Sequence, residues 1–264
     1  MSFLAPLLFT IFVWWASTGL VLYLVGRPRR TFRWTLVGAT VVALLAFVGL
    51  RASSGMATVG GAYCAFTCTL LVWGWQEVAF LLGAVTGPRR SACPGDARGW
   101  RRAALAFQTI SHHEMALVVL GAGVVAATWR QPNQTGLWTF AILWTMRQSA
   151  KLNVFLGVRN LSEEFLPVHL GYLQTYFRRA RMNVLFPIVV AASTWLAARV
   201  WQAASVNGID AATAASLTFA ATLLSLAILE HWFLVLPFPS TPLWNWSLRS
   251  RAAPVGDELG PRLS

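Results

Sequence analysis

The sequence predicts an all-α polytopic membrane protein with about seven transmembrane helices, an external N-terminus and a cytoplasmic C-terminus. Composition is the first reason: of the 264 residues, 56% are hydrophobic and only 11% are charged, whereas a soluble domain carries about 25% charged residues. The second reason is that apolar runs of about 20 residues, the length that spans a bilayer, recur along the whole chain. They lie near residues 3–25, 34–50, 62–86, 103–128, 137–158, 183–203 and 212–237.

The seven runs differ in length and polarity. The first has no basic segment before it and no small-residue cleavage site after it, so we expect an uncleaved span rather than a signal peptide. The second is short for a span. The fifth carries Arg147 and Lys151, so its polar side must face protein rather than lipid. The last run leads into 234–246, a proline-rich segment that we expect along the cytoplasmic interface, with Trp244 and Trp246 as anchors.

The third reason is that basic residues alternate between the connectors. The formal net charge is +12, and the odd-numbered connectors and the C-terminal tail hold Arg27, Arg29, Arg30, Arg33, Arg89, Arg90, Arg98, Arg101, Arg102, Arg159, Arg178, Arg179, Arg181, Arg249, Arg251 and Arg262. The even connectors hold or adjoin only Arg51, Arg130 and Arg199. This alternation follows the positive-inside rule and argues against nucleic acid as a partner. One integral-membrane domain, 1–264, with a cytoplasmic tail from about residue 247, accounts for the chain.

Ionisable residues inside the apolar runs are the strongest functional signal. All four histidines lie next to, or within a few residues of, a carboxylate in apolar surroundings. The groups within the runs are Glu77, His112, His113, Glu114, Arg147, Lys151, Glu230 and His231, and those in the fifth connector are Glu163, Glu164 and His169. Because burying such groups in a membrane is costly, they mark functional sites by default.

Counting along the predicted spans places these groups at one depth. Glu77 lies nine residues before the inner end of its run and His113 ten residues after the inner start of the next, about 14 Å at 1.5 Å per residue. A polar layer in the cytoplasmic half of the bilayer therefore contains Glu77, His112, His113, Arg147, Lys151, Glu230 and His231. The fifth connector is unusually apolar, and we expect an interfacial or re-entrant cap that lowers Glu164 and His169 towards this layer.

Imidazoles and carboxylates together form the ligand set of a metal site. The candidate ligands are Glu77, His112, His113, Glu114, Glu163, Glu164, His169, Glu230 and His231. They suit a mono- or dinuclear iron site, although the Glu-x-x-His spacing of diiron bundles is absent. Because successive helical residues point about 100° apart, only one of His112 and His113 faces a given point easily.

A structural interpretation stands beside the metal site. Arg147 and Lys151 could pair with Glu77, Glu114 or Glu230 and simply neutralise buried charge. The same two cations could instead bind a propionate of a pigment, and Trp232 could pack against its flat macrocycle. The sequence alone leaves these alternatives open.

Four segments resemble a known family. They are 111–114 (SHHE), 160–172 (NLSEEFLPVHLGY), 181–187 (RMNVLFP) and 229–237 (LEHWFLVLP), and over about residues 3–246 the chain resembles the photosynthetic complex assembly protein 2 family of phototrophic purple bacteria. Genes of that family usually lie in the photosynthesis gene cluster, near the gene for the reaction-centre H subunit. The resemblance implies a role in making bacteriochlorophyll or assembling pigment–protein complexes in the bacterial inner (intracytoplasmic) membrane, and it implies no settled catalytic residues.

Three functions are consistent with these observations. The first is an inner-membrane factor that handles bacteriochlorophyll or another Mg-tetrapyrrole, with His113, His231 or His169 on the magnesium and with membrane lipids, reaction-centre and light-harvesting subunits as partners. The second is a membrane-bound mono- or diiron oxidoreductase that acts on a tetrapyrrole or lipid-like substrate. The third and least favoured is a transporter or proton pathway, because the chain shows no inverted repeat of the kind transporters have.

Overall fold

The computed structural model describes residues 3–237 and 241–248 and is all-helical over those residues, apart from one isolated parallel bridge between Val158 and Arg179. The long helices are α1 (Leu4–Val25), α2 (Phe32–Ser54), α3 (Val59–Leu81), α4 (Gly99–Thr128), α5 (Thr135–Leu156), α6 (Leu185–Ala204) and α7 (Ala211–Phe233). The short ones are η1 (Arg29–Thr31), η2 (Glu163–Phe165), η3 (Val168–Tyr176), η4 (Thr241–Trp244) and α8 (Asn245–Leu248). Each predicted apolar run is therefore a long helix.

Within the described residues, six helices are long and apolar enough to cross a membrane: α1, α2 together with η1, α3, α4, α6 and α7. Helix α5 is of similar length, 22 residues, but it carries Arg147 and Lys151. It lies in the middle of the bundle, where it packs against α3, α4 and α7. The polar helix is thus packed among apolar ones, although part of its surface, including Trp138 and Leu152, is exposed.

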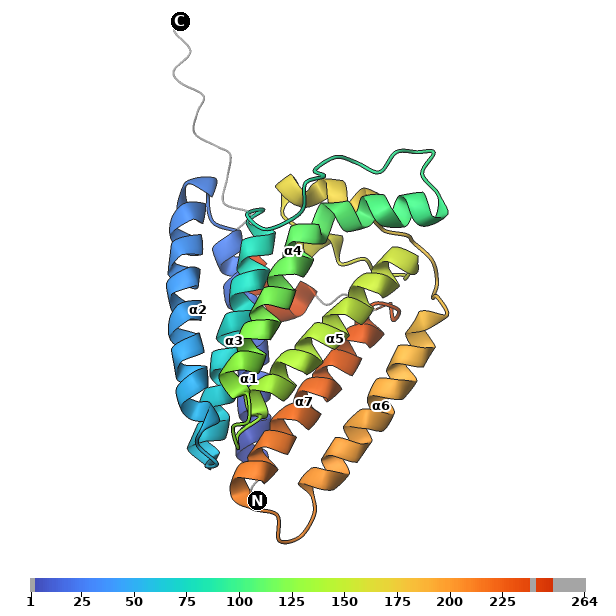
Figure 1. Cartoon of the computed structure of the whole chain (residues 1–264). Helices are drawn as coiled ribbons and strands as arrows, with labels where there is room; N and C mark the ends of the chain where they lie inside the picture. Colours follow the sequence, from blue (N-terminus) through green and yellow to red (C-terminus); the bar gives the residue numbers. More distant parts are fainter. Residues whose placement is uncertain (1–2, 238–240, 249–264) are drawn as a thin grey trace, which may run out of the picture.

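The bundle has a centre and a periphery (Figure 1). Helices α3, α5 and α7 pack against one another; α1 lies against α3 and α7, while α2 packs along α3 and α4. Helix α6 packs mainly on α7 at the edge of the bundle. Aromatic stacking fixes the contact between α3 and α7, where the rings of Phe66 and Phe219 lie 4.4 Å apart at an interplanar angle of 14°.

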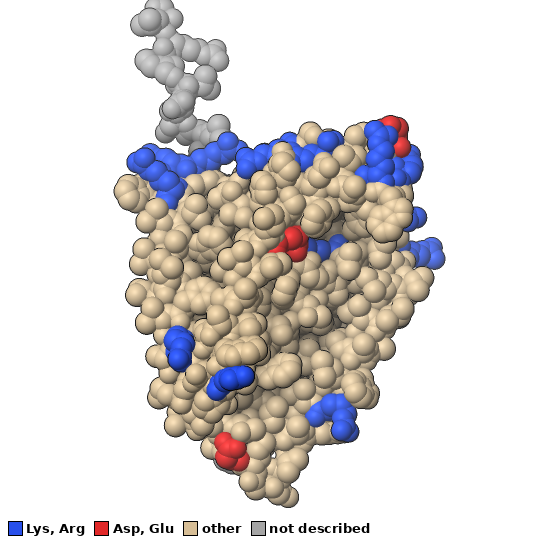
Figure 2. Space-filling view, in the orientation of Figure 1, with Lys and Arg blue, Asp and Glu red and all other residues tan. Residues whose placement is uncertain are grey.

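Basic residues gather at one end of the bundle. Connectors 26–31, 82–98 and 157–184 lie together at the end that we call the basic end, and connectors 55–58, 129–134 and 205–210 lie at the opposite end. Figure 2 shows Lys and Arg side chains concentrated along the first end and few on the apolar wall of the bundle. The alternation of arginines in the sequence is therefore an alternation between two physical ends.

Two helices end earlier than predicted. Helix α3 ends at Leu81 rather than near residue 86, because Gly83 adopts a left-handed conformation with φ of 78°. Helix α7 ends at Phe233 rather than 237, and the Asn160 side chain donates a 2.7 Å hydrogen bond to the carbonyl of Phe233. The α7 end consequently lies below the surface of the basic end (Figure 1).

The segment after α7 does not lie along the interface as the sequence suggested. Trp244 is 5% exposed, packs edge-to-face on Trp14 at 5.5 Å, and donates a hydrogen bond to the Trp15 carbonyl. Trp246 closely approaches Gly19, where a Cβ atom would lie 2.1 Å from its ring. These α1 residues lie near the middle of that helix, so the segment folds back into the bundle.

Close helix packing predicts the effect of one glycine substitution. A Cβ atom on Gly136 of α5 would lie 2.5 Å from Leu50 and 2.8 Å from Thr69, both fully buried. Gly136→Ala should lower the free energy of unfolding by about 1–3 kcal/mol through overpacking. Gly38→Ala is the matched control, because nothing lies within 4 Å of its Cβ position. Thermal unfolding of the detergent-solubilised protein measures both; equal midpoints would contradict the packing described here.

Candidate functional site

Two ion pairs join α5 to its neighbours. Nη2 of Arg147 donates to Oε2 of Glu77 on α3 at 3.1 Å. Nζ of Lys151 donates to Oε1 of Glu114 on α4 at 2.6 Å, and Nε2 of Gln148 donates to Oε2 of the same carboxylate at 2.6 Å. Arg147 and Lys151 lie one helical turn apart, so they reach neighbouring helices from one face of α5. Figure 2 shows an acidic and a basic group side by side within the apolar wall.

Glu230 has a partner that the sequence did not reveal. Its Oε1 accepts a 2.7 Å hydrogen bond from the indole nitrogen of Trp14 on α1. Arg147 and Glu77 both lie within electrostatic range of Glu230. Trp14 is one of 14 tryptophans and is 216 residues away in the chain, so nothing in the sequence singles it out.

His231 is fixed through both ring nitrogens. Its Nδ1 lies 2.8 Å from the Ala227 carbonyl, which only accepts, so this nitrogen donates. Its Nε2 lies 2.6 Å from Oγ of Ser149. The Ser149 hydroxyl also lies 2.9 Å from the Met146 carbonyl, and its single hydrogen can satisfy only one of these two acceptors. Ser149 is a second partner that sequence reasoning missed.

His113 lies inside the bundle with a ring nitrogen that has no partner. The residue is 2% exposed, and its Nδ1 is buried without a hydrogen bond. The ring of Phe80 from α3 covers the imidazole at 4.5 Å between centroids. Lys151 and Arg147 are both within electrostatic range. Buried polar groups are normally hydrogen-bonded, so this imidazole calls for an explanation.

Two more unpartnered side chains lie on the adjoining helix faces. Gln76 is 1% exposed and neither of its amide atoms has a hydrogen-bond partner, and the indole nitrogen of Trp144 on α5 is also buried without one. Gln76 is one turn from Phe80 on α3, and Trp144 packs against the hydrophobic cluster that includes Leu117, which is one turn from His113 on α4. We call Gln76, His113 and Trp144 the unpartnered set. Each such group costs about 1–3 kcal/mol when left unsatisfied.

The remaining predicted residues lie elsewhere. His112 is exposed, and Glu163 pairs with Arg179 at 2.6 Å in the fifth connector, next to the exposed Glu164. His169 lies at the basic end, where its Nε2 is 3.0 Å from the carbonyl of Leu81 at the end of α3. Trp232 is 40% exposed and packs edge-to-face on Phe186 of α6 at 5.4 Å. The connector thus caps the basic end.

The arrangement of carboxylates bears on the iron hypothesis. Over residues 3–237 and 241–248, no three His, Cys, Asp or Glu side chains are close enough together to hold a metal ion. Glu77 and Glu114 are paired with cations, and both nitrogens of His231 have partners. As arranged, these residues do not fit an iron site, which stays a prediction.

Comparisons with known proteins give a family and one relative. The family described as "Protein of unknown function (DUF3623)" matches residues 1–255. The chain is 38% identical over 250 residues to the "Uncharacterized 30.4 kDa protein in puhA 5′region" of Rhodobacter capsulatus, which covers 93% of this chain and 91% of that protein. No solved structure matches the chain.

The Lys151–Glu114 pair predicts a strongly non-additive double-mutant cycle. Lys151→Met or Glu114→Gln alone should lower the free energy of unfolding by about 2–4 kcal/mol, because each leaves a partly buried polar partner unpaired. The double variant should recover at least about 1 kcal/mol of the summed loss. Thermal unfolding in detergent measures the cycle; strictly additive losses would contradict a direct pair.

His169 predicts a pH effect. Burial lowers the pKa of His169 below its ordinary value of 6.5. The unfolded chain then binds a proton more readily than the folded one, so stability falls as pH drops through about 6.5 towards the folded-state pKa. His169→Gln should lose less thermal stability between pH 7.5 and 5.5 than the wild type. An identical loss in both proteins would show that His169 does not titrate in this way.

Proposed function

The chain belongs to the DUF3623 family, and from that premise we propose that it is an inner-membrane factor for bacteriochlorophyll biosynthesis or for the assembly of photosynthetic pigment–protein complexes. The name of the Rhodobacter capsulatus relative places its gene at the 5′ side of puhA, a location in a photosynthesis gene cluster. The four segments that resemble the photosynthetic complex assembly protein 2 family support the same role. The long apolar helices support a location in the membrane.

The proposed topology has seven spans, with the N-terminus outside and the C-terminus in the cytoplasm. Helix α5 is the span that we add to the six apolar ones, and its charges are compensated by Glu77 and Glu114. The basic end faces the cytoplasm by the positive-inside rule. Under this topology the ion pairs and His113 lie inside the bilayer.

The unpartnered set is the observation that supports a magnesium tetrapyrrole as the ligand. A magnesium tetrapyrrole would need a neutral imidazole nitrogen to hold its metal and hydrogen-bond donors for its carbonyl groups. The unbonded Nδ1 of His113 would supply the first, and the buried amide of Gln76 and indole of Trp144 would supply donors for the second. Phe80 covers the imidazole at 4.5 Å, so a pigment or precursor must displace that ring when it binds.

Arg147 has a part in this proposal as well. Its side chain is 45% exposed while one nitrogen holds Glu77, which leaves further guanidinium donors for the acidic side chain of a precursor. Lys151 is the more enclosed of the two cations, at 25% exposure, and it stays with Glu114. No described contact favours an iron oxidoreductase or a proton pathway over this role.

Two adjacent histidines provide the test and its control: His113 is the proposed ligand and His112 is not. The wild type and His112→Ala, purified in mild detergent from a purple photosynthetic bacterium, should carry a bound bacteriochlorin absorbing in the near infrared. His113→Ala should carry at least about tenfold less, because it loses the imidazole that would hold the magnesium. His113→Gln and thermal unfolding of each variant separate loss of pigment from loss of fold. Absence of pigment from the folded wild type, or equal loss in the His112 variant, would overturn the proposal.

A further inference from the structure

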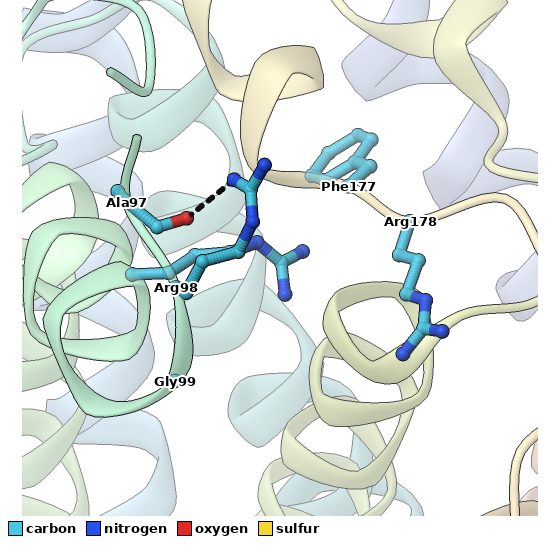
Figure 3. Close-up of a pocket in the computed structure, with 6 residues that line it drawn as sticks. Ala97, Arg98, Gly99, Phe177 and Arg178 are labelled. Atoms are coloured by element: carbon cyan, nitrogen blue, oxygen red, sulfur yellow. Dashed lines mark hydrogen bonds between the residues drawn. The ribbon is translucent and has the colours of Figure 1, made fainter. Parts of the chain in front are cut away.

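A pocket at the basic end gathers three arginines, and we propose that it binds a phosphate group. It has a volume of about 470 Å³ and is lined by Ala97, Arg98, Gly99, Arg102, Phe177 and Arg178. Figure 3 shows Ala97, Arg98 and Gly99, at the start of α4, on one side, and Phe177 and Arg178, from the fifth connector, on the other. The proposal is independent of the pigment role and of the unpartnered set.

Arg102 is held in place before any ligand arrives. Its Nη2 donates to the carbonyls of Phe155 at 3.1 Å and Tyr176 at 2.6 Å. Its guanidinium also lies over the Phe155 ring, 4.1 Å from the centroid. Its Nε and Nη1 make no hydrogen bond within the described part of the chain. An arginine fixed in this way loses little side-chain entropy when it binds an anion.

The positive charge in this pocket has little compensation from protein. Nη1 of Arg98 donates only to the carbonyls of Gly95 and Ala97, at 2.8 and 3.0 Å. Among residues 3–237 and 241–248, the guanidinium of Arg178 has neither a hydrogen bond nor an ion pair. Asp96 is within electrostatic range of Arg98, but its carboxylate is bonded to Arg101.

Three guanidinium groups favour a phosphate over other anions. Each presents several N–H donors in a planar fork, and a phosphate has enough oxygens to accept from more than one of them. Arg98 and Arg178 are both within electrostatic range of Arg102, so the three like charges repel one another until an anion joins them. A phosphate group would turn this repulsion into attraction.

The position of the pocket suggests where the phosphate comes from. The first turns of α4 run across the basic end before the helix descends into the bundle (Figure 1). Trp100, in these turns, is 90% exposed, and exposed tryptophan is enriched at membrane interfaces. Lipid phosphates lie at this level if the bundle spans the bilayer. A soluble phosphate ester offers the same chemistry, so the experiment must separate the two sources.

Native mass spectrometry of the full chain in detergent, titrated with phosphatidylglycerol, tests the site. Arg98→Gln/Arg178→Gln should weaken lipid binding at least about tenfold, since the loss of even one charge-assisted hydrogen bond weakens binding about tenfold or more. The matched control is Arg159→Gln/Arg181→Gln, which removes the same charge from two exposed basic-end residues outside the pocket. The control variant should lose less than about threefold in lipid affinity.

A second arm identifies the source of the phosphate. The midpoint of thermal unfolding is measured with inorganic phosphate against chloride at equal ionic strength. If lipid binding depends on Arg98 and Arg178 but phosphate does not raise the unfolding midpoint, the site binds a lipid headgroup. If phosphate raises the midpoint of the wild type and not of the Arg98/Arg178 variant, the site binds a soluble phosphate. Equal lipid binding by the pocket and control variants, with no arginine-dependent phosphate effect, would overturn the proposal. Unfolding midpoints of both double variants establish that they are folded.

Discussion

Pairing the charges of α5 within the bundle is the constraint on which the rest of the structure depends. Arg147 and Lys151 cannot face lipid without a large cost, so α3 must present Glu77 and α4 must present Glu114 to the same helix. These two requirements set the order of the helices around α5 and the rotation of each about its axis. The apolar helices α2 and α6 can then occupy the edges, where lipid surrounds them.

The same rotation has a consequence for the neighbouring residues. When α3 turns Glu77 towards Arg147, Gln76 is carried into the interior; when α4 turns Glu114 towards Lys151, His113 is carried inward and His112 outward. Residues adjacent on a helix point about 100° apart. On each of these two helices, the rotation that aims the charged residue at α5 therefore also turns its unpartnered neighbour into the interior. The cost of the unpartnered set is therefore coupled to the ion pairs, and a ligand that satisfies the set would stabilise the whole centre.

Much of this arrangement could be predicted from the sequence, and the rest could not for physical reasons. Hydropathy locates every long helix, and the alternation of arginines assigns the connectors to two ends, because both depend on composition along the chain. Counting residues from the inner ends of the predicted spans places Glu77, Arg147 and Glu230 at a similar depth in the membrane. The choice of partner depends on helix rotation and packing order, which a single sequence does not encode in a readable pattern. The Trp14–Glu230 bond and the folding of Trp244 onto α1 are of this kind.

We expect α5 to cross the membrane with its charges paired to Glu77 and Glu114 of the neighbouring helices. Single cysteines introduced at Pro132 and Val168, both exposed and on opposite sides of α5, test it directly in a chain whose Cys64, Cys68 and Cys93 have been replaced. A membrane-impermeant maleimide added to intact spheroplasts should label Pro132→Cys at once, and Val168→Cys only after lysis. Labelling of both positions under the same condition would place the two connectors on one side and contradict the account.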